Sequence, residues 1–382
     1  MPRLDPFTAI RYSPADPVER VSAPPYDVIS PESRDVLAAD PHNVVHLTLP
    51  QDEGPRDRYS VAATTLAGWL EQGVLVPDAE PSFFVYGTDE TEGVSHSSRG
   101  VIGALTLEEF GTGVHPHERT LAGPKADRLA LMQATDANLE PLWFFGSGPL
   151  RGFEEAVVAA TSADPLSDLT TEGVRHRLWR LLPEDAQLLL TDLRTTDLIV
   201  ADGHHRYETA LTFRGLRRAT RGPGPWDQTL ALISDTFYMP PQLRPIHRVC
   251  RGDVTGVLAE LAIEELGLEL SALLEEVGRR GTGSIGVISS RVSGIFRSGG
   301  DLDTEYLGGI VEKHSAPVRY EHAFEQLSVE IGDGATVFIM APVELPTVAV
   351  RAISGERMPP KTTLFMPKPR SGLVMRSLVG SS

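Results

Sequence analysis

The sequence predicts a mixed α/β fold of the α+β type, because strands and helices do not alternate in a regular order. Two observations support this prediction. Short apolar runs bounded by turn residues indicate buried strands, and several segments carry the side chains that begin helices. The 382 residues are enough for two domains, which we place at residues 1–145 and 146–382.

The first fifty residues are interrupted by prolines that restrict the backbone. In the segment 23–27 each proline fixes its own φ and limits the residue before it, so we expect an extended loop that presents Tyr26 and Asp27. A helix is predicted to follow, with Ser30 as its N-cap and Pro31 at its first position.

Local patterns predict the elements that come next along the chain. The predicted helices cover residues 56–72 and 124–134, and the predicted strands cover 83–86, 101–105, 141–145, 174–181, 198–202, 230–234 and 284–289. The first two of these strands are separated by a polar, glycine-containing stretch, so we expect them to form a hairpin.

The charge balance and the cysteine content exclude several classes of protein. The chain has 35 Lys and Arg against 52 Asp and Glu, a formal net charge of −17, so its surface repels nucleic acid unless it conceals a basic cleft. Cys250 is the only cysteine, which excludes an intramolecular disulfide and a zinc site built from several thiolates. No run approaches the roughly 20 apolar residues of a membrane span, and no signal-peptide pattern opens the chain. We therefore expect a cytoplasmic protein without nucleic-acid or membrane partners.

The segment 198–207 is a short apolar strand that turns at Gly203 into a helix. The first turn of a helix exposes unpaired N–H groups and the positive end of the helix dipole, which together favour a bound phosphate. Arg206, His204 and His205 would add side-chain donors. Asp202 either caps the helix or faces the ligand through a metal ion. The alternative interpretation is a capped amphipathic helix with solvated histidines.

A second polar cluster contains His115, His117 and Glu118, on a loop that follows a strand. Two imidazoles and a carboxylate could bind a metal ion, and Glu118 could act as a general base. Alternatively, Glu118 supports the following helix electrostatically. In that helix, Lys125 and Arg128 lie three residues apart, so both can point at one cleft, although a solvated surface pair is as plausible.

The segment 358–368 combines Lys361 and Lys368 with hydroxyl groups and prolines, and could close over a bound anion. Tyr26 and Asp27 could bind a substrate hydroxyl or amine, but a turn held by Asp27 is an equal alternative.

Four separated motifs resemble those of one prokaryotic protein family of unknown function. They are APPYDVIS at 23–30, HERT at 117–120, ADGHHR at 201–206 and MPPKTT at 358–363. The third motif also resembles the phosphate-binding signature of the ParB/sulfiredoxin superfamily, which includes the free serine kinases. Sulfiredoxins have a cysteine after the glycine where this chain has His204, and ParB proteins carry a basic DNA-binding domain that is not evident here. The resemblance therefore implies a ParB/sulfiredoxin-like phosphate-binding core of the serine kinase branch.

This resemblance implies a small-molecule kinase or phosphotransferase that uses a nucleoside di- or triphosphate and Mg²⁺ on a hydroxyl such as that of free serine. Its partner would be a small phosphorylated ligand. The expected roles are phosphate binding for Gly203, His204, Arg206, Lys125, Arg128, Lys361 and Lys368, catalysis for Glu118, Asp202 and His205, substrate binding for Tyr26, Asp27 and His117, and Mg²⁺ binding for Asp202 and Glu118.

Two other functions remain open from the sequence. One is a metal-dependent phosphoester hydrolase with His115, His117, Glu118, Asp202 and His204 or His205 as ligands. The other is a protein that binds or senses nucleotides without catalysis.

Overall fold

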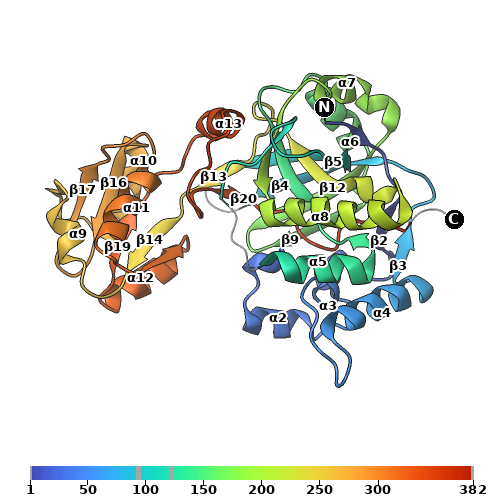
Figure 1. The fold of residues 1–382 in the computed structure, drawn as a ribbon, viewed down its shortest axis with the longest axis horizontal. Helices are drawn as coiled ribbons and strands as arrows, with labels where there is room; N and C mark the ends of the chain where they lie inside the picture. Colours follow the sequence, from blue (N-terminus) through green and yellow to red (C-terminus); the bar gives the residue numbers. More distant parts are fainter. Residues whose placement is uncertain (1, 92–95, 120–123, 380–382) are drawn as a thin grey trace. The chain divides into compact units, whose positions relative to one another are not determined.

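A computed structural model describes residues 2–91, 96–119 and 124–379. The chain forms two compact units (Figure 1): unit 1 comprises Met1–Gln242 and Pro367–Ser382, and unit 2 comprises Leu243–Met366. The domain boundary expected at residue 145 does not coincide with this division, because it falls within a strand of the main sheet of unit 1. The predicted mixed α/β class is confirmed.

Unit 1 is built around a mixed sheet, which has nine strands among the described residues. Its order is β6-β11-β8-β12-β5-β4-β10-β9, with β1 paired to β5. The strands are β1 (Leu4–Asp5), β4 (Phe83–Glu90), β5 (Ser97–Thr106), β6 (Val114–His115), β8 (Leu142–Gly146), β9 (Ser167–Thr171), β10 (Val174–Leu181), β11 (Leu198–Asp202) and β12 (Gln228–Ser234). The predicted hairpin is confirmed by the antiparallel pairing of β4 with β5.

A smaller sheet joins the two ends of the chain in unit 1. Its order is β3 (Leu75–Pro77), β2 (Ala9–Tyr12), β21 (Met375–Ser377) and β7 (Ala137–Asn138). Because β21 pairs with both β2 and β7, the C-terminal segment belongs to the same unit as the N-terminal residues.

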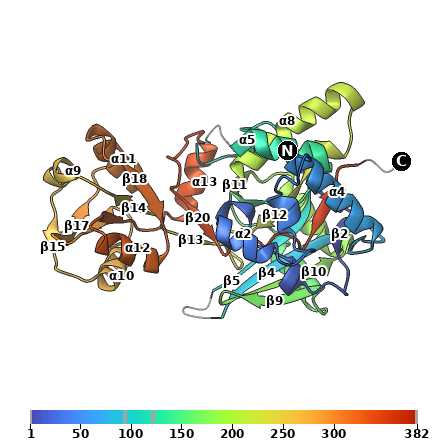
Figure 2. The same cartoon turned by 90° about the horizontal axis from the view of Figure 1, so that it is seen from below.

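The helices of unit 1 pack on these sheets. They are α1 (Val18–Val21), α2 (Pro31–Leu37), α3 (Val45–Thr48), α4 (Arg58–Glu71), α5 (Pro124–Thr135), α6 (Phe153–Thr161), α7 (Gln187–Leu193) and α8 (His204–Arg221). As predicted, the Ser30 side chain caps α2 by accepting the N–H of Ser33, and Pro31 occupies the first turn. Helices α5 and α8 lie side by side in both views (Figures 1 and 2). The main core contains Phe144 and Val200 from the sheet, Phe153 from α6 and Tyr207 from α8.

Unit 2 has an antiparallel sheet of order β15-β17-β16-β19-β14-β18 within the described residues. Its strands are β14 (His247–Cys250), β15 (Glu264–Glu265), β16 (Ser284–Ile288), β17 (Ser293–Arg297), β18 (Val318–Glu321) and β19 (Thr336–Ile339), and its helices are α9 (Thr255–Ala259), α10 (Leu270–Arg280), α11 (Asp303–Lys313), α12 (Phe324–Gly332) and α13 (Leu345–Ile353). Two apolar clusters form its core. The chain enters and leaves unit 2 through β13 (Gln242–Arg244) and β20 (Leu364–Met366), which pair with each other.

Across the described residues, none of the helices combines the length and the apolar character that crossing a bilayer requires.

Candidate functional site

The turn between β11 and α8 has the backbone geometry that the sequence predicts. Gly203 adopts φ 98° and ψ 28°, in the left-handed region, and no side chain caps this first turn in the described structure. A Cβ atom at Gly203 would lie 2.7 Å from Leu142 Cδ2 and 3.1 Å from Arg206 Nη2. Glycine is therefore required here for both conformation and space. Since Asp202 does not cap α8, its carboxylate is left for other partners.

Five charged side chains form a continuous series beside this turn, which we call the ionic ladder. Lys368 Nζ lies 2.6 Å from Asp27 Oδ2 and 2.9 Å from Asp202 Oδ1. Arg206 Nη2 lies 2.8 Å from Asp202 Oδ2, and Arg206 Nη1 lies 3.3 Å from Glu140 Oε2. With three acids and two bases, the ladder has a formal charge of 2 − 3 = −1. The order of charges alternates along the ladder, so each cation lies between two carboxylates.

The pKa values of the ladder show how strongly these groups depend on each other. Burial alone would raise the pKa of Asp202, but Lys368 and Arg206 lower it below the ordinary aspartate value. Burial would likewise lower the pKa of Lys368, but Asp202 and Asp27 raise it. The pKa of Arg206 is raised by Glu140 and Asp202, which outweigh its burial. Asp202, Lys368 and Arg206 are therefore charged at neutral pH.

Glu140 fixes the proline-rich loop against the ladder. Its Oε1 accepts a hydrogen bond of 3.3 Å from the Tyr26 backbone N–H and another from the Ser371 hydroxyl, and its side chain is only 8% exposed. The Tyr26 ring lies under the Arg128 guanidinium, whose Cζ is 4.2 Å from the ring centroid. Burial raises the pKa of Tyr26, although Arg206 and Arg128 oppose this. The predicted substrate-binding residues Tyr26 and Asp27 thus lie at the ladder.

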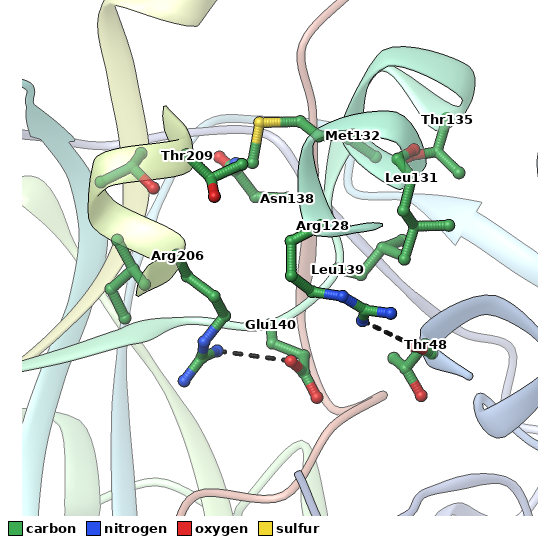
Figure 3. A pocket seen from close by; sticks show the side chains of 13 residues that line it. Thr48, Arg128, Leu131, Met132, Thr135, Asn138, Leu139, Glu140, Arg206 and Thr209 are labelled. Carbon is green, nitrogen blue, oxygen red and sulfur yellow. Dashed lines mark hydrogen bonds and ion pairs between the residues drawn. The ribbon is translucent and has the colours of Figure 1, made fainter. Parts of the chain in front are cut away.

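A cavity opens beside the ladder (Figure 3), where Arg206 and Glu140 face each other and Arg128 lies nearby. Its other walls are largely apolar or bear hydroxyl groups, from Thr48, Leu131, Met132, Thr135, Ala137, Asn138, Leu139, Leu142, Thr209 and Thr229. Its volume of about 50 Å³ accommodates water but not a nucleotide, because ligand pockets usually measure at least about 300 Å³. A nucleotide would need side chains of the ladder to move.

The histidine loop and the first turn of α8 meet in space. His117 Nδ1–H donates to the Val200 carbonyl over 2.6 Å, and the His117 backbone N–H donates to His204 Nε2 over 3.3 Å. The two rings contact edge to face, with centroids 4.6 Å apart. Glu118 follows directly and is partly exposed. Two motifs that are more than eighty residues apart in the sequence thus belong to one site.

The structure separates some residues that the sequence groups together. Lys125 forms an ion pair with Glu208 on α8, whereas Arg128 lines the cavity and donates to the Thr48 carbonyl over 2.7 Å. Lys125 and Arg128 therefore have different partners, and of the two only Arg128 lines the cavity. His115 is the last residue of β6, and its Nε2 lies 3.2 Å from Asp197 Oδ1.

The remaining predicted residues are placed as follows. His205 is partly exposed in the first turn of α8. Lys361 is exposed, with φ 61°, and it belongs to unit 2, whereas all five residues of the ladder belong to unit 1. Thr120 of the HERT motif lies outside the described residues. Among the residues that are described, no three His, Cys, Asp or Glu side chains are grouped as a metal site would require.

Sequence reasoning missed Glu140, Ser371 and Thr48. Of these three residues, only Glu140 could have been noticed in the sequence, because it is a lone acidic residue directly before Pro141 and the apolar strand β8. Its partners could not be identified from local pattern, because they come from distant parts of the chain.

Comparisons with known proteins give distant structural similarities and one family. A conserved hypothetical protein from Pyrococcus furiosus matches with a TM-score of 0.38 and 16% identity, covering 71% of this chain and 91% of that one. A free serine kinase in complex with AMP matches with a TM-score of 0.39 and 16% identity, covering 72% and 92%. SbnI with a C-terminal truncation, from Staphylococcus aureus, matches with a TM-score of 0.41 and 11% identity, covering 71% and 85%. No curated protein sequence matches this chain significantly. The sequence profile described as "Protein of unknown function (DUF1015)" matches residues 4–302, and the chain belongs to this family.

Proposed function

We propose that this protein is a nucleotide-dependent small-molecule kinase or phosphotransferase that acts on a hydroxyl group, such as that of free serine. One observation carries the proposal: Arg206 and Lys368 converge on Asp202 beside a glycine turn at the uncapped start of α8. Phosphoryl transfer depends mainly on positioning and on stabilising negative charge, and this arrangement supplies cationic and backbone donors at one point.

In this proposal the phosphates displace the carboxylates from the two cations. Arg206 offers a planar fork of donors and Lys368 a single ammonium group, both suited to phosphate oxygens. The backbone N–H groups after Gly203 would add donors along the helix dipole. His204, Lys125 and Arg128 are further candidates for contacts with the nucleotide.

Two carboxylates of the proposed site, Asp202 and Glu118, are the candidate ligands of a bound Mg²⁺. Magnesium is usually held by one or two carboxylates, with phosphate and water oxygens completing its shell. Asp202, released from Lys368 and Arg206, would be the first of these ligands and Glu118 the second. The formal charge of −1 on the ladder would repel an incoming phosphate, and the positive charge of the metal ion would offset this repulsion.

The acceptor would lie between the proline-rich loop and the histidine loop. Tyr26, Asp27 and His117 are the candidates to hold it, and Glu118 and His205 are the candidates to accept its proton. Glu140 would act through Tyr26 and Arg206 as a positioning residue.

The metal-dependent hydrolase is less well supported. A ring nitrogen of His117 donates to a backbone carbonyl, and a ring nitrogen of His204 accepts a backbone N–H. Both imidazoles are thus oriented by backbone groups of neighbouring segments, and each offers at most one nitrogen to a metal ion.

The test is to incubate the full-length protein with Mg²⁺, a panel of ATP, ADP, GTP and CTP, and a panel of hydroxy-amino acids. We expect one nucleotide to give a phosphorylated product, detected by mass spectrometry. Arg206→Ala should lower turnover by about 100-fold or more. Arg218→Ala is the matched control, because Arg218 lies on the same helix in an exposed ion pair with Asp227, and it should leave turnover unchanged.

Two results would contradict the proposal. Nucleotide binding that Arg206→Ala weakens, without turnover of any nucleotide, would indicate a sensing protein. Neither binding nor turnover with any of the four nucleotides would remove the nucleotide from this site altogether.

A further inference from the structure

Strand β18 is an edge strand of the sheet in unit 2. Within the part of the chain that is described, it pairs with β14 on one side and with no strand on the other. An open edge presents backbone groups that another strand can bind. The opposite edge of the sheet is protected differently, because β15 has only two residues, both glutamates, and Glu264 pairs with Arg280 over 2.7 Å.

The side chains of β18 point alternately to the two faces of the sheet. Tyr320 lies opposite Arg248 on β14, and the Arg248 Cζ is 5.1 Å from its ring centroid. Arg319 and Glu321 point to the other face, where Arg319 Nη1 donates to Glu330 of α12 over 2.7 Å. Tyr320 is 44% exposed and the Arg319 side chain is 60% exposed, so both are accessible to a second molecule. The Glu321 side chain is 15% exposed, and its Oε1 accepts the backbone N–H groups of His322 and Ala323, so a second molecule would contact its Oε2.

We infer that two copies of this chain associate by antiparallel pairing of their β18 strands, about a two-fold axis that passes beside Tyr320. In this register Tyr320 lies opposite Tyr320 of the second copy. Arg319 of each copy lies opposite Glu321 of the other, which gives two ion pairs on one face and a pair of aromatic rings on the other. The same surface serves both copies, as a two-fold interface requires.

Charge selects this register over its neighbours. A slip by one residue would place paired side chains on opposite faces of the sheet, so only registers that keep the faces matched are possible. Moving the axis to Arg319 would place two arginines opposite each other, and moving it to Glu321 would do the same with two glutamates. The order Arg-Tyr-Glu is thus complementary to itself only when the axis lies at Tyr320.

The four residues of β18 make a small contact. We therefore expect weak association that depends on protein concentration and weakens at high salt, because the ion pairs are partly exposed.

The first test is sedimentation velocity of the full-length protein up to about 1 mM, together with Arg319→Glu and Glu321→Arg. Each variant places like charges opposite each other and should be monomeric alone. An equimolar mixture should form a heterodimer, because the two variants then present opposite charges at both pairs.

Folding of Arg319→Glu is supported by Arg251, which still binds Glu330 over 2.8 Å. Glu275→Arg makes the same charge change as Glu321→Arg at an exposed position on α10, and it should dimerise like the unmodified protein.

A second variant probes the axis itself. Tyr320→Glu keeps a favourable neighbour in Arg248 within each copy but places two carboxylates opposite each other across the axis, so it should be monomeric. The inference is overturned if the unmodified protein is monomeric throughout the concentration range. It is equally overturned if the dimer persists in Tyr320→Glu, or if the mixture of the two charge variants stays monomeric.

Discussion

At the scale of single residues, the charged side chains of the candidate site form ion pairs with one another. Lys368 is shared by Asp27 and Asp202, and Arg206 is shared by Asp202 and Glu140. A buried ion pair gains little net stability over an apolar pair, but removing one partner leaves an uncompensated charge. The ladder therefore holds its charges in a fixed arrangement, but replacing any one of its residues should lower the stability of the folded protein.

Asp202 should make stability depend on acid pH. Its pKa is lowered in the folded protein, so its contribution is complete above the unfolded value of about 4 and is lost as the pH falls toward the folded value. We expect Asp202→Asn to lower the free energy of unfolding by about 2 kcal/mol at neutral pH, less than for an isolated pair because each cation keeps a second carboxylate. The difference should narrow below pH about 4.

Urea unfolding of both proteins between about pH 7 and pH 3 measures this difference. Asp301→Asn, at an exposed aspartate of unit 2, is the control and should follow the unmodified protein at every pH. A constant difference across the whole range would contradict the assignment to Asp202 ionisation.

Glu140 should matter to stability as much as any residue of the proposed phosphate site. It accepts from Arg206, from the Tyr26 N–H and from the Ser371 hydroxyl. We expect Glu140→Ala to cost about 3 kcal/mol, because it leaves the charge of Arg206 less compensated and two donors unpaired. Glu140→Gln retains an acceptor oxygen and should cost less. Equal unfolding free energies for the two variants would show that the negative charge, and not the acceptor oxygen that glutamine retains, is what Glu140 supplies.

At the scale of elements, a substitution in the β11–α8 turn tests whether the turn requires glycine at position 203. Gly203→Ala forces a Cβ to within 2.7 Å of Leu142 Cδ2 at φ 98°, so we expect a loss of about 1–3 kcal/mol in unfolding free energy. Gly215 is the matched control in the same helix, where a Cβ meets nothing within 4 Å. Gly215→Ala should therefore stabilise the protein by up to about 1 kcal/mol. Chemical denaturation of the three proteins measures both changes, and equal effects of the two substitutions would contradict a special role for Gly203.

The elements that local signals specify could be predicted, and the contacts between distant segments could not. The apolar run before Gly203, the Ser30 cap and the β4–β5 hairpin each depend on neighbouring residues, and all three are confirmed. Glu140 instead binds partners that are 66, 114 and 231 residues away. Hydrophobic periodicity in the sequence does not reveal contacts between such distant residues. Glu140, which joins the ladder to the proline-rich loop, was therefore not predicted.

At the scale of the whole molecule, the division into units also depends on contacts between distant segments, which local patterns in the sequence do not predict. The sequence predicts β21 no better than any other short segment, yet its pairing with β2 and β7 returns the chain end to unit 1. A boundary placed at residue 145 does not include this return. Unit 2 is consequently a continuous segment inserted between two parts of unit 1.

A continuous insertion with its own core should fold by itself. The sheet of unit 2 pairs only strands of that unit among the described residues, and its two apolar clusters draw on residues of that unit alone. We expect a fragment of residues 243–366 to unfold cooperatively in urea, with a free energy of about 5–10 kcal/mol. Val337→Asp is the control, because Val337 is fully buried between β14 and β16 and an unpaired charge there should abolish the transition. A fragment without a cooperative transition would show that unit 2 needs the rest of the chain to fold, in which case the two units form one cooperative structure despite their separate cores.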